Sequence, residues 1–425
     1  MPWLFLLVSL VGAWFTYNTF RPRYAPAWRA GVSFFAGWLT AELALHHIAW
    51  QVLMTVVFTW AGALRAWPGI LGLVVSMISW IGLALCYRDA RQAKDVIERA
   101  LRDGLGADYG EKIAPEIRAG NSPQIDWRQI ALPVPIRHRD VERLRNIVYT
   151  RVAGLNLKLD VYRNRFSPPG RPTLLHVHGG GWVIGSKNEQ GLPLMLHLAA
   201  RNWVCVSVNY RLSPHATFPD HLLDLKRAVA WIREHGREYG ADPDFMVVTG
   251  GSAGGHLAAL LALTADDKAY QPGFEQVDTS VRGCVAFYGV YDFTNRHGAW
   301  HHTALHKLLE RHVMKASFEE APEAYQKASP ISCIHPGAPP FLVIHGNRDT
   351  LAPVEEARRF CEAFRSRGHG KIAYAEIPGA QHAFEIFHSH RTLLVIRGVE
   401  RFLAHLHGEY VRASASASVG QAHPV

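Results

Sequence analysis

Two short stretches decide the fold of this chain: His178-Gly179-Gly180-Gly181-Trp182 and, further along, Gly250-Gly251-Ser252-Ala253-Gly254. The second has the spacing Gly-x-Ser-x-Gly, which is typical of a serine on a sharp turn between a strand and a helix. Glycines flank such a serine because a side chain at either position would collide with the tight turn. The first has the form of a loop whose backbone N–H groups bind an oxyanion. In this order, the two stretches predict a nucleophilic serine beside an oxyanion-binding loop.

Strands and helices alternate around these two stretches. Apolar runs of strand type cover residues 173–178, 203–208, 245–249, 281–288, 340–345 and 371–377. Segments with helical spacing lie between them, so the sequence predicts a mostly parallel, doubly wound α/β sheet, covered on both faces, over residues 145–407. The stretch 293–329 interrupts the alternation, has room for two or three short helices, and is expected to cover the pocket as a lid.

A serine hydroxyl becomes a good nucleophile only when a neighbouring base, usually a histidine oriented by a carboxylate, takes its proton. In folds of this kind the chain order is serine, acid, histidine, and each residue follows a strand. Asp349 and His382 each lie in the loop directly after an apolar strand. We therefore expect Ser252 as nucleophile, Asp349 as acid and His382 as base, with Asp292 as the reserve acid.

The oxyanion donors are expected to be the backbone N–H groups of Gly179, Gly180 and Ala253. Losing one such donor typically costs about 3–4 kcal/mol of transition-state stabilisation. An ordinary tight turn is the alternative explanation of the glycines, but three adjacent glycines after an apolar strand favour the catalytic one. Because the chain supplies nucleophile, base and electrophile, we expect no metal and no organic cofactor.

The first quarter of the chain is apolar and differs from the rest. Residues 2–20, 31–64 and 68–87 form three apolar stretches. A bilayer-spanning helix needs about 20 such residues, which the first and third stretches supply. The middle stretch is too long for one upright span and is expected to be one long, tilted or bent helix, with a hairpin as the alternative. Residues 1–88 are therefore predicted to be a transmembrane anchor of about three helices.

Basic residues predict the orientation of this anchor. They follow the first span at Arg21, Arg23 and Arg29, and the last span at Arg88, Arg91 and Lys94. Three spans put both clusters on one side, and the positive-inside rule puts that side in the cytoplasm. We expect a multi-pass protein of a bacterial inner membrane with a cytoplasmic catalytic domain. Two middle spans would reverse this orientation.

Three ionisable residues, Glu42, His46 and His47, interrupt the middle apolar stretch. Glu42 and His46 are spaced i, i+4, so on a continuous helix they share a face and can pair. Ionisable residues inside a membrane suggest function by default. We favour the simpler interpretation, a polar kink packed between helices or close to the interface.

The remaining composition narrows the class of protein further. The formal charge of +9 is scattered, and no basic stripe with interleaved aromatics indicates a nucleic-acid partner. Five cysteines without a Cys-x-x-Cys spacing fit neither a disulfide framework nor a zinc site. Residues 89–144 are predicted to be an amphipathic helix and a linker, and the Ala- and Ser-rich residues 408–425 a disordered tail.

The soluble part resembles the α/β-hydrolase superfamily, specifically its hormone-sensitive-lipase-like branch of esterases and lipases. The matching strings are His178-Gly179-Gly180-Gly181-Trp182, Asn209-Tyr210-Arg211-Leu212-Ser213-Pro214, Phe218-Pro219, Gly250-Gly251-Ser252-Ala253-Gly254-Gly255-His256 and His382-Ala383-Phe384. The resemblance implies an α/β-hydrolase fold. It also implies hydrolysis of short- to medium-chain acyl esters or lipids through an acyl-enzyme.

Two features depart from that branch. The acid motif His345-Gly346-Asn347-Arg348-Asp349 and the tryptophan after the glycines are closer to arylformamidase- and feruloyl-esterase-like proteins. The apolar N-terminus resembles membrane-anchored bacterial lipases and esterases and the isoprenylcysteine methylesterase type. An arylformamidase-like amide hydrolase is therefore one alternative. A non-catalytic ligand receptor on the same fold is another, and the complete serine, acid and histidine set argues against it.

Overall fold

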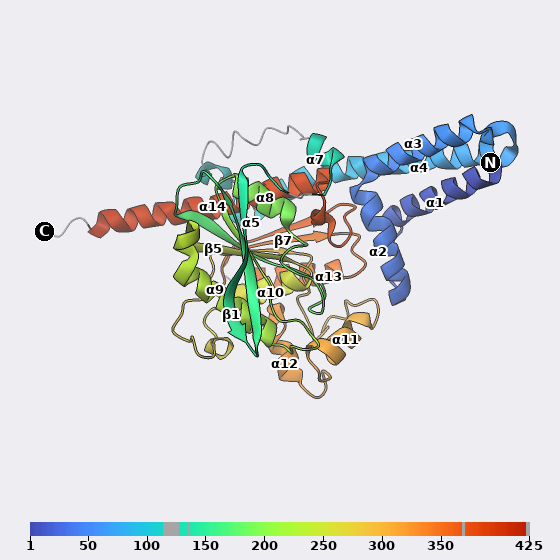
Figure 1. Cartoon of the computed structure of the whole chain (residues 1–425). Coiled ribbons are helices and arrows are strands. Elements are labelled where there is room, and N and C mark those ends of the chain that lie inside the picture. Colours follow the sequence, from blue (N-terminus) through green and yellow to red (C-terminus); the bar gives the residue numbers. More distant parts are fainter. Residues whose placement is uncertain (114–126, 135–136, 368–369, 422–425) are drawn as a thin grey trace.

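An eight-stranded sheet with the order β1-β2-β4-β3-β5-β6-β7-β8 forms the centre of the computed structural model (Figure 1), which describes residues 1–113, 127–134, 137–367 and 370–421. The strands are β1 Val141–Val152, β2 Leu155–Asn164, β3 Arg171–Val177, β4 Val204–Val208, β5 Ala241–Gly251, β6 Gly283–Phe287, β7 Phe341–Gly346 and β8 Ile372–Ile377. From β4 to β8 all neighbours are parallel, whereas β1 and β2 form an antiparallel edge. The predicted mostly parallel, doubly wound sheet is confirmed.

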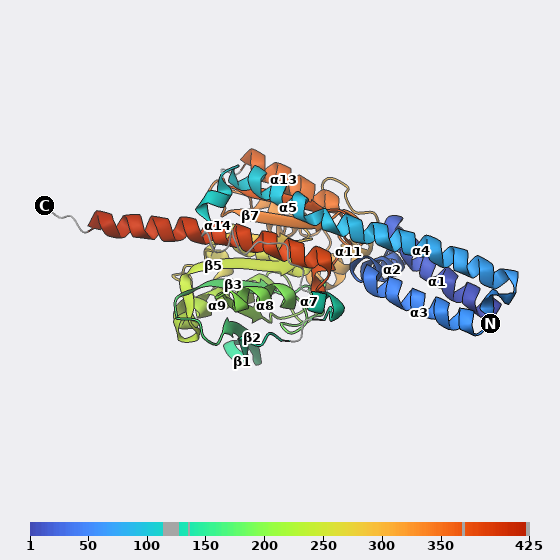
Figure 2. The same ribbon diagram turned by 90° about the horizontal axis from the view of Figure 1, so that it is seen from above.

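Helices cover both faces of this sheet (Figure 2). One face carries α9 Asp220–His235, α10 Ala253–Leu263 and α13 Val354–Arg367, and the other carries α5 Ala93–Leu105, α8 Leu192–Ala200 and α14 His390–Gln421. Successive strand residues point to opposite faces, so Val247 packs in one apolar cluster and Val248 in the other. Both faces are buried beneath helices, which is why the inner strands are continuously apolar.

The apolar N-terminal helices extend from one side of this domain. They are α1 Pro2–Phe20, α2 Ala27–Glu42, α3 Ala44–Trp60 and α4 Trp67–Arg91. In Figures 1 and 2, α1, α3 and α4 lie side by side, and α2 leaves them to lie against the catalytic domain. The first helix, and α4 continued by α5, are each long and apolar enough to cross a membrane, and α2 with α3 makes a third candidate bent by 90°. The middle stretch is therefore two helices that meet at a 90° bend, and whether they form one membrane span stays a prediction.

Other boundaries differ from the predicted ones. Strand β1, which begins at Val141, was missed because its exposed and buried positions do not alternate cleanly. A short helix, α7 Trp127–Ala131, lies in the predicted linker, of which residues 114–126 and 135–136 are outside the described residues.

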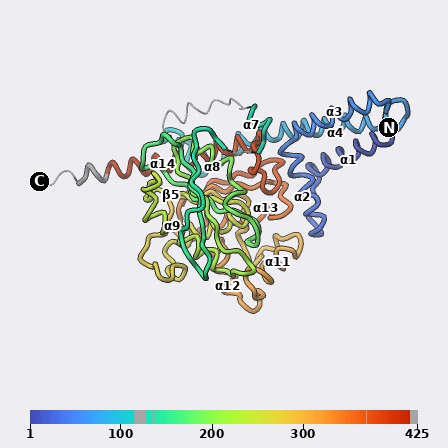
Figure 3. Tube along the Cα trace, viewed as in Figure 1, coloured from blue at the N-terminus to red at the C-terminus, as the bar shows by residue number. Residues whose placement is uncertain are grey.

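The C-terminal helix and the predicted lid complete the chain. Instead of a disordered tail, α14 continues to Gln421, because alanine is the strongest helix former and no proline interrupts this segment. Figure 3 shows this helix leaving the domain on the side opposite the N-terminal helices. The predicted lid region contains α11 Ala304–Leu308, a π-helical turn Leu309–Val313 and α12 Pro322–Lys327. Its role as a lid stays a prediction.

Candidate active site

Ser252 lies on a strained turn between β5 and α10. Its backbone has φ 58° and ψ −124°, outside the regions that residues with a side chain prefer. The Ser252 N–H donates to the Phe287 carbonyl at 3.0 Å, which fixes the turn to the neighbouring strand β6. A Cβ on Gly254 would lie 2.2 Å from the Val177 carbonyl oxygen, so only glycine lets α10 approach β3 this closely. The Gly-x-Ser-x-Gly spacing is explained by these contacts.

Asp349 and His382 meet in the loops after β7 and β8. The His382 Nδ1–H donates to Asp349 Oδ2 at 2.6 Å, and both side chains are buried. Asp349 Oδ1 accepts the N–H groups of Leu351 and Ala352, each at 2.8 Å. Burial by itself would raise the pKa of Asp349, but the rings of His382 and His345 hold that pKa well below its ordinary value. The carboxylate is therefore ionised and aimed at His382.

His345 is a second contact of the same carboxylate. Its Nε2 lies 3.2 Å from Asp349 Oδ2 and 3.0 Å from the Ala352 carbonyl oxygen. The ring is fully buried at the end of β7, and its two contacts hold the loop that carries Asp349 in place. The reserve acid, Asp292, has a different partner. Its carboxylate pairs with Arg296 at 3.0 Å, whereas the carboxylate bonded to His382 is that of Asp349.

The Ser252 hydroxyl has no hydrogen bond to the loops of Asp349 and His382 in the described part of the chain. Among the described residues, it forms no hydrogen bond with His382 or any other group, as is common when no substrate is bound. Tyr288 joins the two sides, because its ring centroid is 4.5 Å from that of His382. A Cβ on Gly251 would lie 2.6 Å from the Tyr288 hydroxyl oxygen. Shared neighbours thus bring the serine turn and the histidine loop together.

The oxyanion loop requires one correction. The Gly179 N–H, predicted to bind the oxyanion, already donates to Gln190 Oε1 at 2.6 Å. In the part of the chain that the structure describes, the N–H groups of Gly180, Gly181 and Ala253 make no such bond. Gly180 has φ 111°, and a Cβ there would lie 2.1 Å from the Ile184 carbonyl oxygen. Gly181 therefore replaces Gly179 as a candidate donor. The glycine pattern could not show this, because the acceptor of the Gly179 N–H is a side chain, Gln190.

Trp182 fixes the end of this loop. Its ring is buried and its Nε1–H donates to His256 Nδ1 at 3.2 Å, while His256 Nε2–H donates to the Ala328 carbonyl at 2.7 Å. Burial lowers the pKa of His256 to about 3, so the ring stays neutral and can accept a hydrogen bond. His256 therefore has a structural role. Across the described ranges, no three His, Cys, Asp or Glu side chains gather as metal ligands would.

Helix α2 lies against the histidine loop, a contact that the sequence does not predict. The Phe34 ring stands edge-on to His382 with 6.3 Å between ring centroids. The Trp38 Nε1–H donates to the Ala383 carbonyl at 2.9 Å. An apolar helix of the N-terminal region is therefore part of the wall around the candidate base. The apolar pattern of α2 indicates that it is buried, but not against which surface.

Polar contacts extend this interface. Glu42 forms a buried ion pair with Arg391, and its second oxygen accepts the Ser389 hydroxyl at 2.6 Å. Glu42 does not pair with His46 in the described structure, because the helix breaks at Leu43 and turns by 90°. This break agrees with the polar kink that we favoured. The partners of Glu42 thus lie outside its own segment. It ties the N-terminal region to the start of α14.

Comparisons with known proteins agree with this geometry. A family model for BD-FAE matches residues 159–364. The chain is 40% identical to "Probable carboxylic ester hydrolase LipM" of Mycobacterium tuberculosis, over 95% of this chain and 93% of that protein. It is 38% identical to esterase LipQ of the same organism, over 90% and 86%. The solved apo form of Thermogutta terrifontis esterase 2 is 26% identical, with a TM-score of 0.51 over 63% of this chain and 93% of that one.

Proposed function

Because this chain belongs to the α/β-hydrolase esterases that include LipM and LipQ, we propose that it hydrolyses carboxylic esters through an acyl-enzyme on Ser252. The observation that carries this proposal is the 2.6 Å hydrogen bond between His382 Nδ1 and Asp349. That bond fixes the imidazole tautomer and leaves Nε2 as the acceptor for the serine proton.

The reaction has two halves. His382 Nε2 takes the Ser252 proton as Oγ attacks the ester carbonyl carbon, and Asp349 stabilises the imidazolium that forms. The N–H groups of Gly180, Gly181 and Ala253 bind the oxyanion of the tetrahedral intermediate. This intermediate then collapses to the acyl-enzyme and expels the alcohol, whose oxygen takes the proton from His382. A water molecule deprotonated by His382 then cleaves the acyl-enzyme. The products are a carboxylic acid and the free serine.

We propose that α1, α3 and α4 cross the membrane, with the catalytic domain in the cytoplasm. The support is the apolar length of α1 and α4, the apolar α2–α3 pair that passes the same test only as a unit, and the position of the charges. Arg21 directly follows α1 and Arg88 lies in the last turn of α4, at the ends that adjoin the catalytic domain. Arg65 lies in the short turn Ala63–Arg65 between α3 and α4, and this turn is at the far tip of the helices (Figure 1). The excess of basic residues on the domain side predicts a cytoplasmic domain.

The bend between α2 and α3 relates the proposed membrane to the proposed site. If α3 crosses the bilayer, the 90° bend directs α2 along the membrane surface, between lipid and catalytic loops. The side chains of Trp28 and Phe35 are 65% and 63% exposed on α2, while Phe34 contacts His382. We therefore propose that the substrates are short- to medium-chain acyl esters or lipids that enter from the membrane surface.

A fluorophosphonate probe tests the nucleophile. We expect it to label the wild type and the control Ser366→Ala, which alters an exposed serine on α13, but not Ser252→Ala. Purified protein should then be assayed across a series of acyl esters, with one aryl formamide included. Labelling of Ser252→Ala, or turnover of the formamide alone, would contradict the proposed reaction.

A C-terminal reporter tests the orientation. We expect a fluorescent protein fused after Val425 to mature, and an alkaline phosphatase at the same position to remain inactive. The opposite pair of results would place the catalytic domain outside the cytoplasm.

A further inference from the structure

Tyr288 and Glu385 form a buried pair beside the candidate base. The Tyr288 hydroxyl donates to Glu385 Oε1, and both side chains are buried. Among the described residues, the second carboxylate oxygen of Glu385, Oε2, has no hydrogen-bond partner. A buried carboxylate that is incompletely bonded costs stability, and groups of this kind are concentrated at functional sites.

The backbone of Tyr288 adopts an uncommon conformation. This residue follows β6 with φ 35°, a positive value that is unusual for an aromatic residue. Its N–H donates to the Ile344 carbonyl of β7 at 2.7 Å. Gly251 of β5 leaves the room that the phenol needs, because a Cβ there would lie 2.6 Å from the hydroxyl oxygen. Three neighbouring strands thus fix this side chain, and backbone strain of this kind is concentrated at functional sites.

The Tyr288 ring lies against the imidazole of His382. The two ring centroids are 4.5 Å apart, and the ring planes are inclined by 54°. A cation within about 6 Å of a tyrosine ring centroid is attracted by the electrons of the ring. In the proposed reaction, His382 becomes a cation when it takes the serine proton. The attraction therefore grows as the transition state forms, which is the condition for an interaction to accelerate a reaction.

Glu385 adds a carboxylate to this contact. It lies three positions after His382, in the turn Phe384–Ile386. Burial raises the pKa of Glu385 above its ordinary value, whereas the Tyr288 hydrogen bond and the charge of His382 oppose that rise. Burial, and after it the charge of Glu385, raises the pKa of Tyr288 well above its ordinary value, so the phenol keeps its proton and remains the donor. Because an electrostatic interaction is mutual, the Glu385 carboxylate stabilises a protonated His382.

Other groups surround His382 from the elements packed around it. Asp349, in the loop after β7, accepts from Nδ1, and His345 contacts the same carboxylate from the end of β7. Helix α2 contributes the uncharged ring of Phe34. Burial, and after it the charge of Asp349, raises the pKa of Tyr24 in the loop before α2, so that phenol is neutral too. Asp349 is therefore the one carboxylate among these groups.

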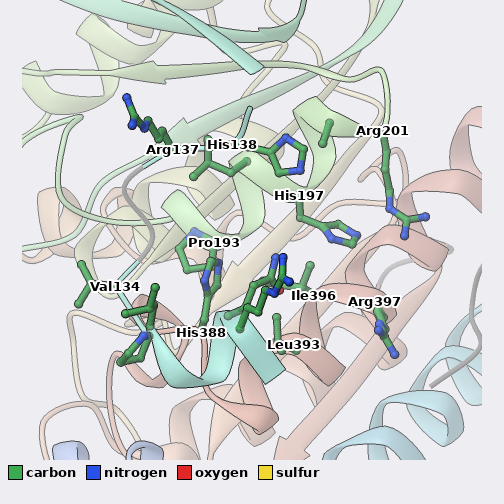
Figure 4. Close-up of a pocket in the computed structure, with 16 residues that line it drawn as sticks. Val134, Arg137, His138, Pro193, His197, Arg201, His388, Leu393, Ile396 and Arg397 are labelled. Atoms are coloured by element: carbon green, nitrogen blue, oxygen red, sulfur yellow. The ribbon is translucent and has the colours of Figure 1, made fainter. Parts of the chain in front are cut away.

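Little water reaches the pair. Glu385 is 6% exposed and Tyr288 is 2% exposed. A hollow between α7, α8 and α14 reaches the same loop at His388 (Figure 4), but its described lining includes neither residue of the pair. In such surroundings a charge acts more strongly on its neighbours than it does in water.

We infer that Tyr288 and Glu385 are positioning residues that stabilise the imidazolium form of His382 during ester hydrolysis, a role that rests on the proposed function of Ser252. Asp349 fixes the imidazole tautomer through a hydrogen bond to Nδ1. The Tyr288–Glu385 pair acts through its charge and its ring contact instead. Its loss should therefore leave the tautomer intact and change the proton affinity of the ring.

The rate at which a fluorophosphonate labels Ser252, measured against pH with the full-length protein in detergent, tests this role. Labelling needs a neutral His382, so the rate rises with pH and its midpoint reports the pKa of His382. Glu385→Gln keeps an oxygen that can accept from Tyr288 but removes the charge. We expect its midpoint to be lower by about half a unit to one unit, the usual strength of a desolvated cation–π contact. The plateau rate, and kcat for a water-soluble ester, should fall by up to about 10-fold with KM nearly unchanged, because the base is weaker.

Two further variants complete the test. Tyr288→Phe keeps the ring but takes the hydrogen bond from Glu385, whose carboxyl then binds a proton more readily, so the midpoint should move in the same direction. Should Glu385→Gln fail to fold, this variant decides the question. The matched control Glu362→Gln makes the same change of charge at an exposed position on α13 and should keep the midpoint and the plateau of the wild type.

The midpoint separates this role from a merely structural one. A folded variant with a lower plateau but an unchanged midpoint would overturn the inference, because a misplaced imidazole slows labelling without a change in its proton affinity. A midpoint shifted to higher pH would overturn it as well. A wild type that is not labelled at any pH, or labelling that survives Ser252→Ala, would instead remove the proposed function, and the role of the pair with it.

Discussion

Replacing Glu42 by glutamine tests whether the N-terminal helices stabilise the active site. The Glu42 and Arg391 side chains are 0% and 1% exposed. Two other nitrogens of Arg391, Nε and Nη2, already lack a partner among the described residues. The variant keeps the size of the side chain but leaves a guanidinium buried without a counter-charge.

The expected cost follows from that burial. Removing one partner of a buried ion pair typically costs about 3–5 kcal/mol, because the remaining charge is neither solvated nor paired. With about 2.1 cal/mol/K of unfolding entropy per residue, this corresponds to a Tm lower by about 5–9 °C for a domain of roughly 260 residues. Turnover should also fall, because Ser389, a neighbour in the same network, lies in the chain between His382 and α14.

Thermal unfolding and hydrolysis of a water-soluble ester, both in one detergent, measure these effects. The control Glu362→Gln breaks an exposed pair with Arg359 and should change stability by less than about 1 kcal/mol. The double variant Glu42→Leu/Arg391→Met removes both charges and should recover most of the lost stability. A Tm of Glu42→Gln within about 1 °C of wild type, or a double variant no better than the single one, would refute the reasoning.

Further predictions concern the loops around Ser252 and the helix α2 that contacts them. Asp349→Asn should lower kcat by about 10⁴-fold with little change in KM, since the imidazole loses its tautomer. Because the pKa of Asp349 is lowered in the fold, its ionisation adds stability that is full above about pH 5 and declines progressively below about pH 4, as the pH falls toward the lowered folded-state pKa, so denaturant titrations should show the gap to Asp349→Asn closing in acid. Gly180→Ala should lower kcat by about 10²-fold, as its Cβ would displace the oxyanion loop, whereas Gly110→Ala, which has open space, should be near wild type. A chain starting at Asp89 loses the contacts of Phe34 and Trp38 with the histidine loop. We expect a lower Tm by differential scanning fluorimetry and a lower kcat for ester hydrolysis. Unchanged values would show that α2 does not stabilise the active site.

The sheet and the positions of Ser252, Asp349 and His382 could be predicted from the sequence because each depends on local rules. Buried parallel strands are continuously apolar, and the loops that follow them meet at one edge of the sheet. The serine turn needs glycines on steric grounds that act within a few residues. These rules placed Asp349 and His382 in neighbouring loops before any contact was known. They also separated His382 from the other 23 of the 24 histidines by its position after a strand.

Contacts between distant segments were decided by the tertiary structure alone. Glu42 and Arg391 are 349 positions apart, and no periodicity links them. The apolar face of α2 indicated burial, but whether lipid or protein covers it depends on the 90° bend at Leu43. The Gly179 N–H was assigned wrongly because its acceptor, Gln190, reaches it only through the folded loop. The sequence by itself thus determined which groups are the candidates for the chemistry, because strand boundaries and turn geometry are local. Only tertiary packing decided what surrounds those groups. An apolar pattern such as that of α2 predicts that a surface is buried, but it does not predict which segment covers that surface.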